Sequence, residues 1–236
     1  SIGNVTATPS TAHYGDTITL TATPAEGYNF TSYTVTQGTT NIPVTNNNTF
    51  TMPDGDVTVS ATFTPIDYAV SVGNIEHGTV TASKTTNAQV GETITLTPTP
   101  ATGYQLGTLT VKQGTKDVTV TNNTFIMPAG DVTVSATFTL ANYTVSLGTF
   151  THGRVSATKT TAHYGDQITL TVTADDGYKL NALTVKQGET TVEVSANNTF
   201  KMPAGSVTVK AEFIAIGYSI TIQSATTQDP KSRRRH

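Results

Sequence analysis

One stretch of sequence, ending in a strongly alternating segment, occurs three times at constant spacing. It reads FTMPDGDVTVSATF at residues 50–63 and returns with few changes at residues 125–138 and 200–213. The copies are 75 residues apart (125 − 50 and 200 − 125). Self-similarity at a fixed period is typical of a tandem repeat, so we expect three small units and not one large domain.

The composition limits what can hold such units together. With 236 residues in the chain, each unit is near the lower size limit for a self-sufficient core. The chain has no Trp. It also has no Cys, which excludes disulfides and thiolate chemistry. Thr accounts for 53 of the 236 residues, and this β-branched residue suits strands with one face in solvent. We therefore expect stability to depend on β-pairing and on contacts between units.

The charge pattern excludes several classes of partner. The formal net charge is −3, and the first basic residue is Lys84, so binding to nucleic acid through phosphate neutralisation is not expected. No apolar run is long enough for a transmembrane helix, so we expect no membrane insertion. No signal peptide is present and the sequence starts inside a repeat, so we interpret it as a fragment of a longer protein.

Segments in which apolar and polar residues alternate predict the strands of each repeat. In the first copy, residues 3–7, 17–22 and 57–63 alternate with a period of two and are separated by residues typical of turns. Residues 28–35 do not alternate strictly. They fit either a bulged strand or a single helical turn, and these interpretations correspond to an all-β or an α+β fold.

A preliminary strand is predicted ahead of the second and third copies. It starts with Tyr and alternates over residues 68–72 and 143–147, whereas the first copy lacks it. The same pattern recurs at residues 218–222 with no repeat behind it. We expect repeat 1 at 1–66, repeat 2 at 67–141, repeat 3 at 142–216, an orphan strand of a fourth repeat or a closing strand of repeat 3 at 217–223, and a disordered tail at 224–236.

The recurring pattern reads Y-x-V-x-x-G and G-x-V, then G-[DE]-x-I-T-L-T, G-Y and T-V, then N-x-T-F-x-M-P-x-[GD]-x-V-T-V-x-A-x-F. It resembles the divergent internalin B-type repeat of bacterial surface proteins over about residues 2–216. The Trp that usually follows the Gly-Tyr pair is absent, and Tyr33, Leu109 and Leu183 stand near that position. The resemblance implies β-grasp-like units without catalytic residues. The expected fold is mainly β, with three tandem small β-rich repeats, all-β or α+β with at most a short helical turn, in an elongated array.

Two segments bring an imidazole, a phenol and a carboxylate together. They read His-Tyr-Gly-Asp at residues 13–16 and 163–166, and a catalytic or metal site would use such a trio. The second copy reads Ala-Gln-Val-Gly-Glu at residues 88–92 and lacks both the His and the Tyr. We therefore interpret the segment as a turn that enters a strand, in which Asp or Glu supports the backbone.

Other polar segments are weaker candidates for chemistry. His77-Gly78 and His152-Gly153 are interpreted as turns and not as metal ligands. Asp54-Gly55-Asp56 could begin a calcium loop, but the later ligands are missing and the third copy has no carboxylate there. A self-formed Lys–Asn crosslink is open to the second and third copies alone, because the first has no Lys. We expect no metal and no cofactor.

Tyrosines repeat in register and suggest a ligand platform. An exposed ring with Asn and Gln nearby could stack on a sugar, and three sites in register would give avidity. The alternative is core packing with the hydroxyl at the rim. The candidate ligand-facing residues are those that follow Gly in each copy, Tyr28, Tyr104 and Tyr178.

These features favour a non-catalytic structural or spacer region of a bacterial cell-surface or secreted protein, as a stalk or adhesin segment with its signal and anchor elsewhere. The alternative is a carbohydrate- or protein-binding module with Tyr- and Asn-lined sites in each copy, whose partner would be a host or matrix protein or a glycan. No nucleophile–base pair or metal spacing recurs in all three copies, so no enzyme is expected. An open sheet edge also predicts head-to-tail self-association, with residues 218–222 of one chain pairing with the first copy of the next.

Overall fold

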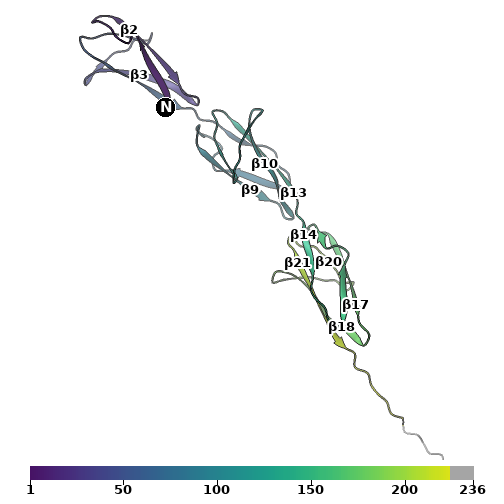
Figure 1. Ribbon diagram of the computed structural model, residues 1–236. Coiled ribbons are helices and arrows are strands. Elements are labelled where there is room, and N and C mark those ends of the chain that lie inside the picture. Colours follow the sequence, from purple (N-terminus) through teal and green to yellow (C-terminus); the bar gives the residue numbers. More distant parts are fainter. Residues whose placement is uncertain (224–236) are drawn as a thin grey trace, which may run out of the picture. The chain divides into compact units, whose positions relative to one another are not determined.

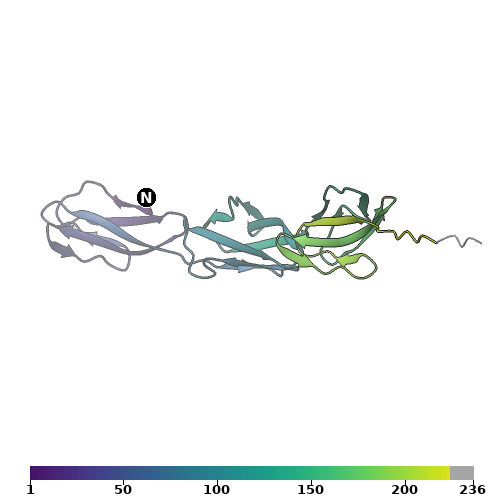
Figure 2. The same cartoon turned by 90° about the horizontal axis from the view of Figure 1, so that it is seen from below.

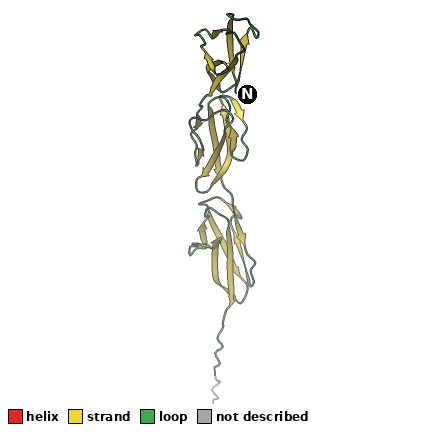
Figure 3. Cartoon of the chain, turned by 90° about the vertical axis from the view of Figure 1, so that its left-hand side faces the viewer, coloured by secondary structure: helices red, strands yellow, loops and turns green. Residues whose placement is uncertain are grey.

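Strands are the regular secondary structure of the computed structural model, which describes residues 1–223 (Figure 3). None of these residues is helical, so the fold is all-β and the α+β alternative does not apply. None of them belongs to a helix that could cross a membrane. The tail predicted at residues 224–236 lies outside the described residues.

The non-alternating stretch at residues 28–35 lies in a bulged strand, which confirms that interpretation. Strand β3 (Tyr28–Gln37) pairs antiparallel with β6 (Thr58–Pro65), and the register shifts between Phe30 and Ser32. The extra residue turns the following side chains to the other face, which breaks the period of two. The same shift interrupts β10 (Tyr104–Gln113) and β18 (Tyr178–Gln187) in the other repeats.

Each repeat consists of small sheets folded from its own continuous stretch of chain, as the sequence colours show (Figure 2). In the first repeat the sheets have the orders β1-β2-β5 and β4-β3-β6, with β1 at Gly3–Thr8, β2 at Thr17–Pro24, β4 at Thr40–Ile42 and β5 at Thr49–Thr51.

The second and third repeats have the same sheets with strands added beside the last one (Figure 1). The second has β8-β9-β12 and β11-β10-β13-β7, with β7 at Val70–Val72, β8 at Gly78–Ala82, β9 at Thr93–Pro100, β11 at Lys116–Val118, β12 at Thr124–Ile126 and β13 at Val132–Leu140. The third has β15-β17-β20 and β16-β14-β21-β18-β19, with β14 at Tyr143–Leu147, β15 at Gly153–Ala157, β16 at Thr161–Ala162, β17 at Gln167–Ala174, β19 at Thr190–Val192, β20 at Thr199–Lys201 and β21 at Val207–Ala215.

The core of each repeat follows from the alternation within its strands. In β2, Ile18 and Leu20 are buried, whereas Thr17 and Thr19 between them are exposed. Because successive side chains point to opposite faces, each sheet has one apolar face on the core and one Thr-rich face in solvent. In the second and third repeats, buried residues from both sheets form one cluster.

The preliminary strand belongs to the repeat that follows it. Strand β7 pairs in parallel with β13, the last strand of the second repeat, and Val70 lies opposite Val132. Strand β14 pairs in the same way with β21. Residues 68–72 and 143–147 therefore belong to the repeats that follow them and do not close the preceding ones. Residues 217–223, expected to form either an orphan or a closing strand, form no strand.

The chain divides into two compact units. One holds the first two repeats within residues 1–141, and the other begins at residue 142 and holds the third.

Candidate functional site

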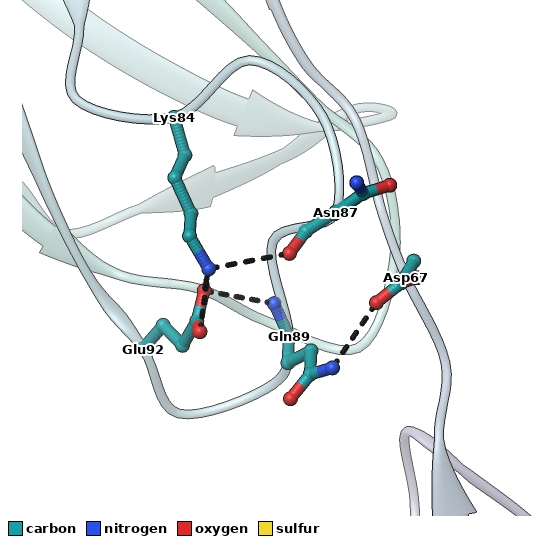
Figure 4. A network of polar contacts seen from close by, with 5 residues as sticks. All are labelled: Asp67, Lys84, Asn87, Gln89 and Glu92. Atoms are coloured by element: carbon teal, nitrogen blue, oxygen red, sulfur yellow. Dashed lines mark hydrogen bonds and ion pairs between the residues drawn. The ribbon is translucent and has the colours of Figure 1, made fainter.

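The turns that lead into β2, β9 and β17 carry side-chain hydrogen bonds and ion pairs. In the second repeat, Lys84 Nζ lies 2.7 Å from both carboxylate oxygens of Glu92 and 3.3 Å from the main-chain oxygen of Asn87 (Figure 4). The main-chain N–H of Gln89 donates to Glu92 Oε2 at 3.1 Å, and its side-chain amide donates to Asp67 Oδ1 at 3.1 Å. The network ties three chain segments together at the entrance to β9.

The acidic residue of this turn holds the backbone in all three repeats. Asp16 accepts from the His13 N–H at 2.8 Å, and Asp166 accepts from the His163 N–H at 3.1 Å, as Glu92 does in the second repeat. Tyr14 and Tyr164 are exposed and lie beside Gly residues with positive φ. These contacts confirm the interpretation of the segment as a strand-entry turn.

A lysine neutralises the acidic residue in two of the repeats. The hydrogen bond from Lys84 lowers the pKa of the Glu92 carboxyl, and the Gln89 N–H adds to the effect. Lys159, 2.8 Å from Asp166, lowers the pKa of that carboxyl in the same way. Both lysines are well exposed, so these are surface ion pairs. Lys84 contacts the main-chain oxygen of Asn87 and not the side-chain amide that a Lys–Asn crosslink would use.

The candidate ligand-facing tyrosines are half-buried, and two of them stack on histidines. The ring of Tyr104 lies 4.3 Å from the His77 ring at an interplanar angle of 5°, and Tyr178 lies 4.0 Å from His152 at 3°. Both histidines have positive φ, as expected of turn residues. The stacks cover one face of each ring. Tyr28 is half-buried without a His partner, and a ligand role for the three tyrosines stays a prediction.

The candidate calcium segment is a turn held by a glutamine. Gln37 Nε2 lies 3.4 Å from Asp54 Oδ1, and in the second repeat Gln113 donates to the Ala129 carbonyl at 2.9 Å. A side chain on Gly55 would collide with Gln37, which explains the Gly. Among residues 1–223, no three His, Asp or Glu side chains gather in a group that could hold a metal ion.

A groove lies along the first repeat where the other repeats hold their preliminary strand. It has a volume of about 330 Å³ and is lined by residues of β1, the loop after it and the segment that leads into β6. Met52, Val57 and Val59 line it and are half-buried. Their counterparts are buried in the second repeat (Met127, Val132, Val134) and in the third (Met202, Val207, Val209).

Asp56 lines this groove. The role of this position, which is to accept a hydrogen bond from the preliminary strand, was not identified from the sequence. Its counterpart Asp131 accepts a hydrogen bond from the main-chain N–H of Ala69 at 2.8 Å, and Ser206 accepts one from Thr144 at 3.0 Å. These bonds fasten the preliminary strand to its repeat. Asp56 lines the groove and has no hydrogen-bond partner in the described part of the chain. The signal in the sequence was a hydrogen-bond acceptor three residues after Pro in every copy.

Comparison with protein families gives three tandem matches to the model of the divergent InlB B-repeat domain, at residues 1–67, 68–142 and 143–217. No curated protein matches the chain. Repeats of this type occur in bacterial surface proteins and are not known as catalytic domains. The chain belongs to the divergent InlB B-repeat family and carries three tandem copies of its repeat.

Proposed function

We propose that this chain is a non-catalytic spacer region of a bacterial cell-surface or secreted protein, used as a stalk or adhesin segment. The observation that carries the proposal is a difference between two sets of residues, those that pack the core of each repeat and those that could form a catalytic or binding site. The residues that pack a repeat recur in all copies, whereas the combinations of turn side chains that could carry chemistry do not. The trio of His, Tyr and carboxylate is missing from the second copy, and a paired lysine is missing from the first.

One packing contact illustrates what recurs. A Cβ on Gly78 would lie 2.5 Å from the Phe138 ring, and one on Gly153 would lie 2.5 Å from the Phe213 ring. The first repeat keeps the same pair in Gly3 and Phe63. A region retained for its length and solubility needs such contacts, Thr-rich outer faces and little else.

Small-angle scattering at several protein concentrations tests the spacer proposal. If the whole chain formed one compact body, its radius of gyration would be roughly 18 Å. Three compact units of one repeat each, placed end to end, would give roughly 28 Å. The spacer proposal expects the larger value at the lowest concentrations. The smaller value would mean that the repeats fold onto one another, and the proposal would fail.

A second candidate is a carbohydrate- or protein-binding module, with a glycan or a host or matrix protein as partner. The observation in its favour is the stacking of His77 on Tyr104 and of His152 on Tyr178, which holds both tyrosine rings in one fixed orientation. An NMR titration with a panel of glycans tests it. Shifts centred on the two tyrosines, lost in Tyr104→Ala and Tyr178→Ala, would support binding, and their absence across the panel would leave the spacer role as the better account.

A further inference from the structure

We propose that the junction between the first and second repeats is a stiff joint, in which the turn before β9 holds the end of the first repeat. The joint consists of the connecting residues 65–68, Gly27 of the first repeat, and Gln89 and Val90 of the second. It deepens the proposed spacer function and rests on that function for its purpose, because a spacer with a stiff joint also holds what it carries in a set direction.

The first half of the connecting segment is fixed to the first repeat. Pro65, the last residue of β6, pairs with Tyr28 of β3. The main-chain N–H of Ile66 then donates to the Gly27 carbonyl at 2.8 Å. The chain is therefore held by the first repeat as far as Ile66.

The second half of the connecting segment is fixed to the second repeat. The main chains of Tyr68 and Ala88 exchange two hydrogen bonds, at 2.8 and 3.0 Å. The side-chain amide of Gln89 donates to Asp67 Oδ1 at 3.1 Å (Figure 4). Each residue from Pro65 to Tyr68 thus has a strand partner or a hydrogen bond in one repeat or the other. A hinge needs residues that are free to change their backbone angles, and this segment supplies few of them.

Val90 also packs directly on Gly27 across the junction. Gly27 is buried and has a φ of +84°. A Cβ built on it would lie 2.6 Å from Val90 Cγ1 and 2.8 Å from Val90 Cβ, so the missing side chain lets the valine approach the main chain closely. A gap of about 1 Å between packed atoms already loses up to roughly half of their attraction. The contact therefore resists a change in the angle between the two repeats.

The joint gives a role to the residues in which the second copy departs from the others. At this turn the first and third copies carry His and Tyr, at 13–14 and 163–164, whereas the second carries Gln89 and Val90. Gln89 makes the bond to Asp67, and Val90 makes the contact with Gly27. Two variable positions of a common strand-entry turn thus form the joint in the second copy.

Double electron–electron resonance on the full chain tests the joint. The chain has no Cys, so two introduced cysteines take all of the spin label. One labelled pair, Thr21→Cys with Thr97→Cys, spans the junction, and a second pair, Thr97→Cys with Thr133→Cys, lies within the second repeat; all three positions are exposed. We expect the spanning pair to give a distance distribution as narrow as that of the pair within one repeat. A broad distribution for the spanning pair alone would overturn the joint.

That failure would be distinguishable from a failure of the spacer function. A chain with a loose joint and extended repeats keeps a large radius of gyration, so scattering decides the spacer function whatever the width of the distance distribution.

Two variants assign the stiffness to the named contacts. The double variant Gln89→Ala, Val90→Ala removes both contacts of the turn, so it should broaden the distribution of the spanning pair and leave that of the pair within the second repeat unchanged. Gly27→Ala should also broaden or shift it, because the new Cβ meets Val90. The matched control is Gly15→Ala in the same repeat, where φ is +89° and a Cβ would meet nothing within 4 Å.

Gly15→Ala carries the same backbone strain without the contact, so it should leave the spanning distribution unchanged. A distribution that stays narrow in the double variant would overturn the proposal. Equal broadening in Gly15→Ala and Gly27→Ala would overturn it as well, because backbone strain and not the contact with Val90 would then be the cause.

Discussion

The third repeat has counterparts of all the strands of the first and adds β14 and β16 to them, and its buried cluster is almost three times as large. Four residues form the buried cluster of the first repeat, namely Ile18, Leu20, Val35 and Phe50. Eleven residues form that of the third repeat, and the second repeat also has eleven. Much of the difference lies at the preliminary strand, which the third repeat has and the first lacks.

The comparison shows how much of a small core one short strand completes. Strand β14 contributes Val145 directly, but its presence coincides with burial of Met202, Val207 and Val209 as well. The counterparts of these three residues in the first repeat are half-buried. A unit of this size has few apolar residues to spare, so the loss of one edge strand exposes much of its interior.

The largest expected effect contrasts a methionine in the two repeats. Met202→Ala should destabilise the third repeat by about 2–5 kcal/mol, because it leaves a cavity in a closed core. Met52→Ala should cost the first repeat clearly less, because Met52 borders the groove and solvent can fill the space. Hydrogen exchange followed separately in β17 and β2 measures both. Equal losses of stability in the two variants would show that the core of the first repeat is as closed as that of the third.

A glycine substitution tests the packing that all repeats share. Gly153→Ala should destabilise the third repeat by roughly 1–3 kcal/mol, since the added Cβ would overlap the Phe213 ring. Gly217→Ala is the control, because a Cβ there would meet nothing within 4 Å. Thermal unfolding of both variants checks the difference. An unchanged Gly153→Ala variant would mean that the ring moves aside easily.

The acceptor that fastens the preliminary strand gives a smaller and more local effect. Asp131→Ala removes the bond to the Ala69 N–H and should cost the second repeat roughly 0.5–1.5 kcal/mol. Asp56→Ala should leave the stability of the monomeric first repeat unchanged, because Asp56 has no partner there. Amide exchange of β7 and of β6 reports the two outcomes. Destabilisation by Asp56→Ala at low concentration would reveal a partner for Asp56.

The smallest effect concerns the lysines that the first repeat lacks. Lys84 lowers the folded-state pKa of Glu92, so its contribution to stability is present above the unfolded-state pKa of the carboxyl and is lost as the pH falls through the lowered folded-state value. Lys84→Met should raise the pKa of Glu92 and remove that contribution, and added salt should weaken it in the wild type. An NMR titration of the Glu92 side chain checks the direction, and an unchanged pKa would contradict it.

The repeat period, the all-β fold and the inward and outward residues of β2 could be predicted from sequence because each depends on local alternation. For residues 28–35 the sequence left two interpretations, a bulged strand and a helical turn. Both interrupt the alternation of apolar and polar residues, so the pattern could not distinguish them. The partner of the preliminary strand could not be predicted, because parallel pairing of β7 with β13 joins residues about 60 positions apart. The groove of the first repeat is a consequence of that pairing.

Hydrogen exchange of the Val57 amide, compared with that of Val132 at low protein concentration, tests the central claim most directly. The account predicts rapid exchange at Val57 and protection at Val132, because the Ala69 carbonyl accepts the Val132 N–H and the first repeat lacks the equivalent strand. Equal protection of both amides at the lowest concentration would show that the edge of β6 is already covered and would contradict the account.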